Sequence, residues 1–266
     1  MKIVSLFYVG LGLLTCLSSA TIYATAPTST TAGGTTTIDI NNTRFMFDYP
    51  PRMTEVLAPV ALQQNWYWPA SKLYRLNSSE LSSSQLNSTK PEQQRALVLQ
   101  QLAQLQQSAE PALQTELATL QLQVKNWRLA ERIVIPIDYD LARAQVPFNR
   151  RFEPGLYKLQ LVARPEQVHF WGAVTKNIAM PHSGATAVAD YMSAIERSDV
   201  ADSTIVYIMQ PDGRIIKAGV AAWNQLHIEA MPGAQIFIPF ASGWFGAELE
   251  KLNQNLLALA LHRVVE

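Results

Sequence analysis

The sequence predicts an α+β fold, and three features of the chain support this. Segments that alternate apolar and polar residues flank a long middle stretch whose apolar residues recur at helical spacing, and a second helical stretch ends the chain. Hydrophobic residues make up 48% of the 266 residues, which is enough to bury a core in one or two domains. Since the formal net charge is +0, no long-range field favours nucleic acid or an anionic membrane as a partner.

Residues 1–24 are predicted to be a secretory signal peptide that is removed on export. A positively charged start precedes an apolar run over residues 3–17, and the small residues Ser18, Ser19 and Ala20 follow, then Ile22-Tyr23-Ala24. The run is shorter than the ~20 residues that span a bilayer, so no stable membrane span is expected. Cleavage is expected after Ala24, with Ala20 as the alternative site. The single cysteine, Cys16, would leave with this segment, so no disulfide is expected.

Residues 35–76 are predicted to begin a first β domain. Apolar and polar residues alternate on both sides of the turn-forming pair Asn41-Asn42, which indicates a β-hairpin. A short helix is expected over residues 53–62. The aromatic cluster at residues 65–69 favours core packing, because large aromatic side chains dominate cores, and a surface for sugar stacking is the alternative.

A Ser- and Asn-rich linker leads to a helical hairpin at residues 89–128. Thr89 and Glu92 have the spacing of a capping box at the start of the first helix. Pro111 restarts the pattern, and the apolar residues then recur at the spacing of an amphipathic helix. We expect this apolar stripe to pack in the core, and a coiled coil that binds a partner is the alternative.

Residues 131–150 are predicted to return to the first domain as a strand, in which Pro136 indicates an edge or a bulge. Asp138 and Asp140 are two apart and would share one face of this strand. Such a pair can hydrolyse glycosides or hold a hard cation, although a solvated strand end is the more usual role. Arg132 begins an otherwise apolar strand and needs a partner. That partner is either Asp138 or Asp140 within the protein, or an anionic group of a ligand.

Residues 154–240 are predicted to form a second β domain, in which one helix lies across a mixed sheet. The turn Pro-Asp-Gly at residues 211–213 separates two of its strands. Strands are expected at residues 156–162, 168–174, 204–209, 214–220 and 235–240, and the helix at residues 186–195.

Residues 244–266 are predicted to form a C-terminal amphipathic helix. Its apolar stripe contains Leu249, Leu252, Leu256 and Leu259. Packing of this stripe on the protein's own sheet is favoured. The alternative is that the four leucines form a partner surface that docks onto a membrane-bound protein, since the helix has too few cations to anchor itself in a membrane.

The sequence contains no motif of a common catalytic site. It lacks the nucleophile elbow, the phosphate loop, the dinucleotide fingerprint and the zinc-protease motif. The four histidines are scattered without the spacing of metal ligands. We therefore expect no catalytic residue, no metal and no cofactor.

Several motifs occur in an order that is typical of one known family. They include Phe-Trp-Gly-Ala-Val at residues 170–174 and, most specifically, Ala-Trp-Asn-Gln-Leu-His-Ile-Glu at residues 222–229, which runs into Pro-Gly-Ala-Gln-Ile at residues 232–236. The aromatic residues 66–69 and the segment 132–140 match further parts of the pattern. The chain therefore resembles the GfcC family of capsule and exopolysaccharide biosynthesis proteins.

This resemblance implies two β-grasp domains with an inserted helical hairpin and a C-terminal amphipathic helix. It implies a periplasmic protein of a Gram-negative bacterium that is not an enzyme. Such a protein would bind polysaccharide, or a partner in the outer-membrane polysaccharide-export machinery, during capsule assembly. Arg132 would contact an anionic group, with Asp138 and Asp140 beside it. The alternative function is a periplasmic hydrolase that modifies glycans with Asp138 or Asp140.

Overall fold

The computed structural model describes residues 34–76, 89–241 and 246–264. All of these residues belong to one compact unit, Gly33–Glu266. The expected signal peptide and most of the expected Ser- and Asn-rich linker lie outside the described residues. Within the described part, no helix is long and apolar enough to cross a membrane.

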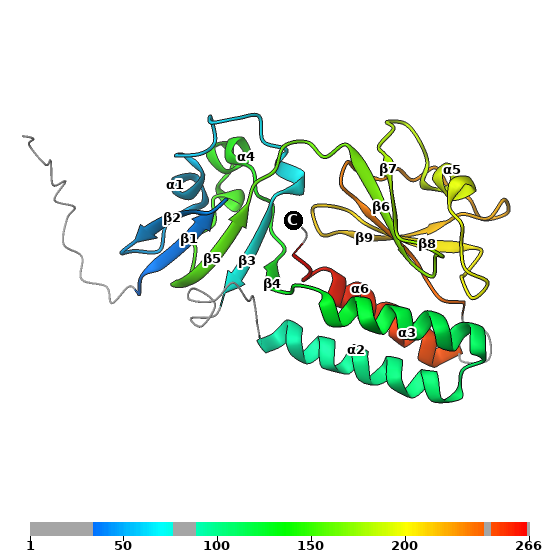
Figure 1. Ribbon diagram of the computed structural model, residues 1–266. Coiled ribbons are helices and arrows are strands. Elements are labelled where there is room, and N and C mark those ends of the chain that lie inside the picture. The colour runs from blue at the N-terminus through cyan, green and yellow to red at the C-terminus, as the bar shows by residue number, and fades with distance from the viewer. Residues whose placement is uncertain (1–33, 77–88, 242–245, 265–266) are drawn as a thin grey trace, which may run out of the picture. The chain divides into compact units, whose positions relative to one another are not determined.

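The first sheet has five strands in the order β2-β1-β5-β3-β4 (Figure 1). Its strands are β1 (Thr36–Ile40), β2 (Thr43–Phe47), β3 (Lys72–Leu76), β4 (Glu131–Ile133) and β5 (Gly155–Gln160). β1 and β2 form the expected hairpin, and Asn41 and Asn42 have φ angles of 47° and 71°. Positive φ at both turn residues gives the turn that matches the twist of the two strands.

The strand β5 belongs to the first sheet, which differs from the domain boundary expected from the sequence. Residues 154–240 were predicted to form one domain, but β5 runs parallel to β1 and antiparallel to β3. The second sheet therefore begins only with residue 167. The reason is that a parallel pair joins strands far apart in the chain, and no local sequence pattern records which strands pair.

One face of the first sheet is covered by two short helices, α1 (Met53–Leu57) and α4 (Tyr139–Ala144). Buried residues of both helices share one core with strand residues such as Ile38 and Leu159. Trp66 and Trp68 of the aromatic cluster pack against this core, and the Trp66 indole donates to the Val60 carbonyl at 2.8 Å. The cluster thus has a packing role.

The second sheet also has five strands, in the order β7-β6-β10-β8-β9. Its strands are β6 (Gln167–Gly172), β7 (Ile178–Pro181), β8 (Ile205–Met209), β9 (Ile215–Gly219) and β10 (Gln235–Ile238). The strand β7 was not predicted from the sequence. The expected helix at residues 186–195 consists of the short α5 (Val188–Tyr191) and a 3-10 turn, Met192–Ala194.

Three helices complete the core of the second sheet: α2 (Thr89–Ser108), α3 (Pro111–Asn126) and α6 (Gly246–Ala260). Buried residues from all three share one hydrophobic core with the second sheet, for example Leu102, Leu117, Leu256 and Phe237. Trp127 at the end of α3 packs edge-on against Trp171 of β6, with ring centroids 5.5 Å apart. The helical hairpin therefore packs on the second sheet, although residues 89–128 lie between two strands of the first.

Candidate functional site

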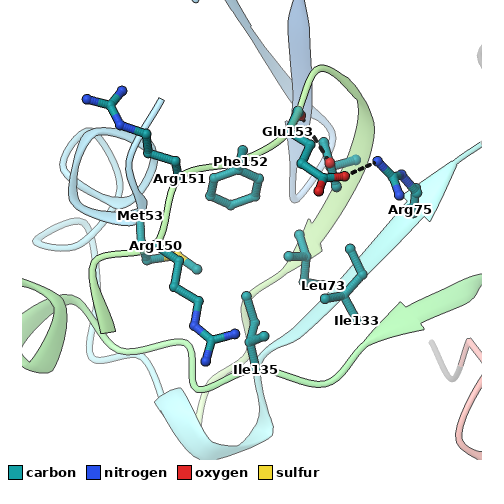
Figure 2. A pocket seen from close by; sticks show the side chains of 10 residues that line it. Met53, Leu73, Arg75, Ile133, Ile135, Arg150, Arg151, Phe152 and Glu153 are labelled. Atoms are coloured by element: carbon teal, nitrogen blue, oxygen red, sulfur yellow. Dashed lines mark hydrogen bonds and ion pairs between the residues drawn. The ribbon is translucent and has the colours of Figure 1, made fainter. Parts of the chain in front are cut away.

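A pocket with a volume of about 320 Å³ opens in the first β domain. Its floor is apolar, and Figure 2 shows how the side chains surround it. The floor residues come from α1, β3, the β4 segment and the chain before β5: Met53, Leu73, Ile133, Ile135 and Phe152. Leu73 and Ile133 are register partners on adjacent strands, so their side chains lie on the same face of the sheet.

Two aromatic rings and an ion pair hold one side of this pocket in place. Phe152 and Tyr157 pack edge to face with centroids 5.3 Å apart. The Arg75 guanidinium pairs with the Glu153 carboxylate at 2.9 Å and lies 5.8 Å from the centre of the Tyr157 ring. The hydrogen bond that Arg75 donates to the Glu153 carboxylate raises the pKa of Arg75. Arg75 is thus a fixed cation whose charge is already neutralised.

The adjacent arginines Arg150 and Arg151 line the same pocket but differ in their surroundings. The Arg151 guanidinium donates to the Pro50 carbonyl at 3.0 Å, and its side chain extends away from the other labelled residues in Figure 2. Arg150 is exposed and extends alongside Ile135. Among the described residues, no hydrogen bond or ion pair involves its guanidinium. Arg150 is therefore the cation that this pocket can offer to a ligand.

An apolar floor beside an unpaired guanidinium suits a specific class of ligand. The face of a sugar ring is apolar enough to lie on aliphatic and aromatic side chains. A carboxylate on the same ring can accept two parallel hydrogen bonds from the guanidinium. Tyr157 cannot offer its hydroxyl proton, because the hydroxyl already donates to the Glu153 carbonyl at 3.0 Å. The pocket therefore fits an acidic sugar better than a neutral one.

Arg132 does not line this pocket. Its guanidinium donates to the Pro211 carbonyl, and burial lowers the pKa of this side chain. The sequence offered Asp138 or Asp140 as internal partners, but no ion pair within the described residues joins either to Arg132. Its partner is instead a backbone carbonyl from the turn between β8 and β9.

Asp138 and Asp140 do not share one face of a strand, as the sequence had suggested. The strand β4 ends at Ile133, and Asp138 is the N-cap of α4, where its carboxylate accepts a hydrogen bond from the Leu141 N–H at 2.9 Å. Asp140 lies in the first turn of that helix. An N-cap aspartate and a first-turn acid both stabilise a helix start, which explains this pair without catalysis.

The four leucines that the sequence offered as a partner surface lie in the core of the second domain. Leu249 is 2% exposed, and Leu252, Leu256 and Leu259 are each 0% exposed. They pack in one cluster with the second sheet and the helical hairpin. In this conformation they are not available to a partner, and internal packing is the role that the structure shows.

The sequence did not single out the arginines of the pocket. Arg75 and Arg150 are separated by most of the first domain, and only the pairing of β3 with β4 and β5 brings their segments together. A weak signal was present, since Arg150 and Arg151 are adjacent and precede the aromatic Phe152. No group of three or more potential metal ligands occurs in the described part of the chain.

Two protein-family models match the chain. The model described as "Capsule biosynthesis GfcC, N-terminal" matches residues 32–164, which contain the whole pocket, and "Capsule biosynthesis GfcC C-terminal" matches residues 176–265. The chain is also similar to the "Uncharacterized protein YjbG" of Escherichia coli (strain K12). The two are 28% identical over 201 residues, which cover 75% of this chain and 78% of the relative.

Proposed function

This chain belongs to the GfcC family of capsule biosynthesis proteins, and we propose from that membership and from the Arg150 pocket that it binds acidic polysaccharide during capsule assembly. We place this activity in the periplasm, because residues 1–24 have the sequence pattern of a secretory signal peptide. The protein would act by binding and not by catalysis. The outer-membrane export machinery would receive the bound polymer from it.

The unpaired guanidinium of Arg150 at the edge of the apolar floor carries this proposal. Arg75 and Arg151 have internal partners at 2.9 and 3.0 Å, so Arg150 alone of the three is free for a carboxylate of the polymer. Binding is favoured over hydrolysis because the carboxylate of Asp138 is used in a helix cap. A hydrolase would need two carboxylates that face one glycosidic bond.

The test measures binding of oligoglucuronate to the exported protein, with a neutral glucan of equal length as the comparison ligand. We expect Arg150→Gln to weaken binding of oligoglucuronate by about tenfold, because a charge-assisted pair of hydrogen bonds is lost. Arg44→Gln is the matched control, since Arg44 is an exposed arginine on β2 outside the pocket. In cells, the Arg150 variant should lower the amount of surface-attached polysaccharide and the Arg44 variant should not.

Three results would contradict the proposal. One is equal affinity for the acidic and the neutral oligosaccharide, and a second is an equal effect of the two arginine substitutions. The third is release of new reducing ends by the purified protein. If Asp138→Asn then abolished that release, hydrolysis would replace binding as the function.

A further inference from the structure

Four basic side chains from separate segments lie near one another: Lys72 on β3, Arg132 on β4, His169 on β6 and Arg263 after α6. Burial, together with the charges of Arg132 and Arg263, lowers the pKa of Lys72 to about 8. Partial burial also lowers the pKa of His169, as do the charges of Arg263 and Lys72. We call these four residues the basic cluster.

No carboxylate neutralises the two guanidinium groups and the amine of the basic cluster within the described residues. None of the ion pairs there includes Lys72, Arg132 or Arg263. The charge of Asp212 favours the charged form of Arg132, but the Asp212 carboxylate already forms an ion pair with Arg214 at 2.7 Å. The Arg132 Nε is buried and has no hydrogen-bond partner. Because it is costly to crowd unpaired cations away from water, this arrangement favours an anion among them.

A second pocket, with a volume of about 240 Å³, adjoins the basic cluster. His169 and Arg263 line it together with Trp171, Asn177 and Gln235, and no acidic side chain is among its lining residues. The Trp171 side chain is only 4% exposed, and its indole N–H has no hydrogen-bond partner in the described part of the protein. A buried N–H without an acceptor is uncommon and marks a place where a ligand acceptor fits.

We propose that the basic cluster and its adjoining pocket bind a phosphoryl group. Two arginines, a lysine and a histidine match the double negative charge of a phosphate better than the single charge of a carboxylate. The pocket beside Arg263 and His169 has room for the rest of a phosphate monoester, such as a sugar phosphate. This site shares no residue with the Arg150 pocket, so the inference goes beyond the proposed polysaccharide binding.

The first experiment follows the apparent pKa of the Lys72 amine through the pH dependence of its acetylation, read by mass spectrometry of the whole exported protein. The exposed Lys251 on α6 is the internal standard. Inorganic phosphate at constant ionic strength should raise the pKa of Lys72 above its value of about 8, because a bound anion stabilises the ammonium form. Sodium chloride at the same ionic strength should leave it unchanged. No rise with phosphate, or an equal rise with acetate, would overturn the proposal.

Variants then assign the binding to these residues. By titration calorimetry, Arg263→Gln should weaken phosphate binding about tenfold, whereas Lys251→Gln should leave it unchanged. Lys72→Gln is a second variant in case Arg263→Gln does not fold, and circular dichroism checks both. If neither Arg263→Gln nor Lys72→Gln weakens phosphate binding, the assignment to the basic cluster is refuted.

A comparison of ligands identifies the source of the phosphoryl group. A hexose phosphate that binds more tightly than inorganic phosphate identifies an ester ligand, and equal affinity identifies free phosphate. Arg150→Gln should leave phosphate binding intact, which separates this proposal from the proposed function.

Discussion

Single polar side chains join segments of this protein that are far apart in the sequence, and His262 is an example. Its Nδ1 accepts a hydrogen bond from the Arg132 N–H at 3.0 Å, and its carbonyl accepts one from the Ala130 N–H at 2.9 Å. Nδ1 can accept only while the imidazole is neutral. Burial is the largest cause of the lowered pKa of His262. The charge of Glu131 and a hydrogen bond with Ala130 act in the opposite direction, and the charges of Lys90 and Arg132 lower the pKa slightly more. The hydrogen bond between the Arg132 N–H and the His262 ring therefore requires a neutral histidine.

We expect this contact to make the protein less stable in mild acid. The pKa of His262 is lower in the folded state than its ordinary value of 6.5, so the stabilising contribution is complete above pH 6.5 and is lost as the pH falls through the folded-state pKa. His262→Asn keeps an acceptor that cannot be protonated, and it should reduce the difference in unfolding free energy between pH 7 and pH 5 by about 1 kcal/mol. Urea unfolding at the two pH values measures this. His227→Asn, at an exposed histidine, is the control, and an equal effect of the two substitutions would contradict the prediction.

Arg132 and Asp138 show how far single residues could be understood from the sequence. A cation at the start of an apolar strand needs a partner, and the structure supplies one for Arg132. That partner is a backbone carbonyl of a distant turn, which side-chain types do not reveal. The alternation of residues 132–140 is typical of one long strand, but it is equally compatible with a short strand followed by a helix cap, which is where the structure has Asp138.

At the scale of elements, the turn between β1 and β2 shows that one residue can have two roles. Asn41 and Asn42 both have positive φ, which asparagine tolerates. The Asn41 side chain also donates to the Leu161 carbonyl at 2.8 Å and accepts from the Leu161 N–H at 2.9 Å. These two bonds fix the end of the β5 segment against the hairpin. Asn41 therefore connects neighbouring elements as well as closing the turn.

Glycine substitutions at the two asparagines separate these roles. Asn42→Gly should change the unfolding free energy by only a few tenths of a kcal/mol, because glycine adopts the same turn. Asn41→Gly should cost about 1–2 kcal/mol, because two hydrogen bonds to Leu161 are lost. Thermal and urea denaturation measure both changes. Equal stabilities of the two variants would show that the side-chain bonds of Asn41 contribute nothing.

At the scale of the whole molecule, the segment after α6 links the second domain to the first sheet. Arg263 forms a bridge with Leu129, and Val264 packs with Tyr74 and Ala130 in a small separate core. The Tyr74 hydroxyl donates to the Arg263 carbonyl at 3.4 Å. Burial also raises the pKa of Tyr74 to about 12. The last described residues thus pack on a strand of the first sheet, far from them in the sequence.

A pair of valine substitutions tests the importance of this link. Val264 is 7% exposed and Val146 is 81% exposed, so the same substitution removes packing at one position and almost none at the other. Val264→Ala should lower the unfolding free energy by roughly 2 kcal/mol, and Val146→Ala by a few tenths at most. Differential scanning calorimetry measures both. Equal losses would mean that the Val264 contact does not contribute to stability.

Local patterns in the sequence predict the kinds of elements and most of their positions. The Asn41-Asn42 hairpin, the helices α2, α3 and α6 and four of the five strands of the second sheet follow from local periodicity, turn residues and proline. The apolar stripe of α6 was also visible, because an amphipathic helix shows its buried face in its spacing. These features depend on residues that are close together in the chain.

Which segments meet becomes visible only in the folded chain. The parallel pairing of β5 with β1, the packing of the helical hairpin on the second sheet and the position of Arg150 beside the apolar pocket floor each join distant parts of the chain. The same is true of the basic cluster, whose members come from four segments. Periodicity records which face of an element is buried, but the partner of that face is selected by packing and hydrogen bonding over the whole fold.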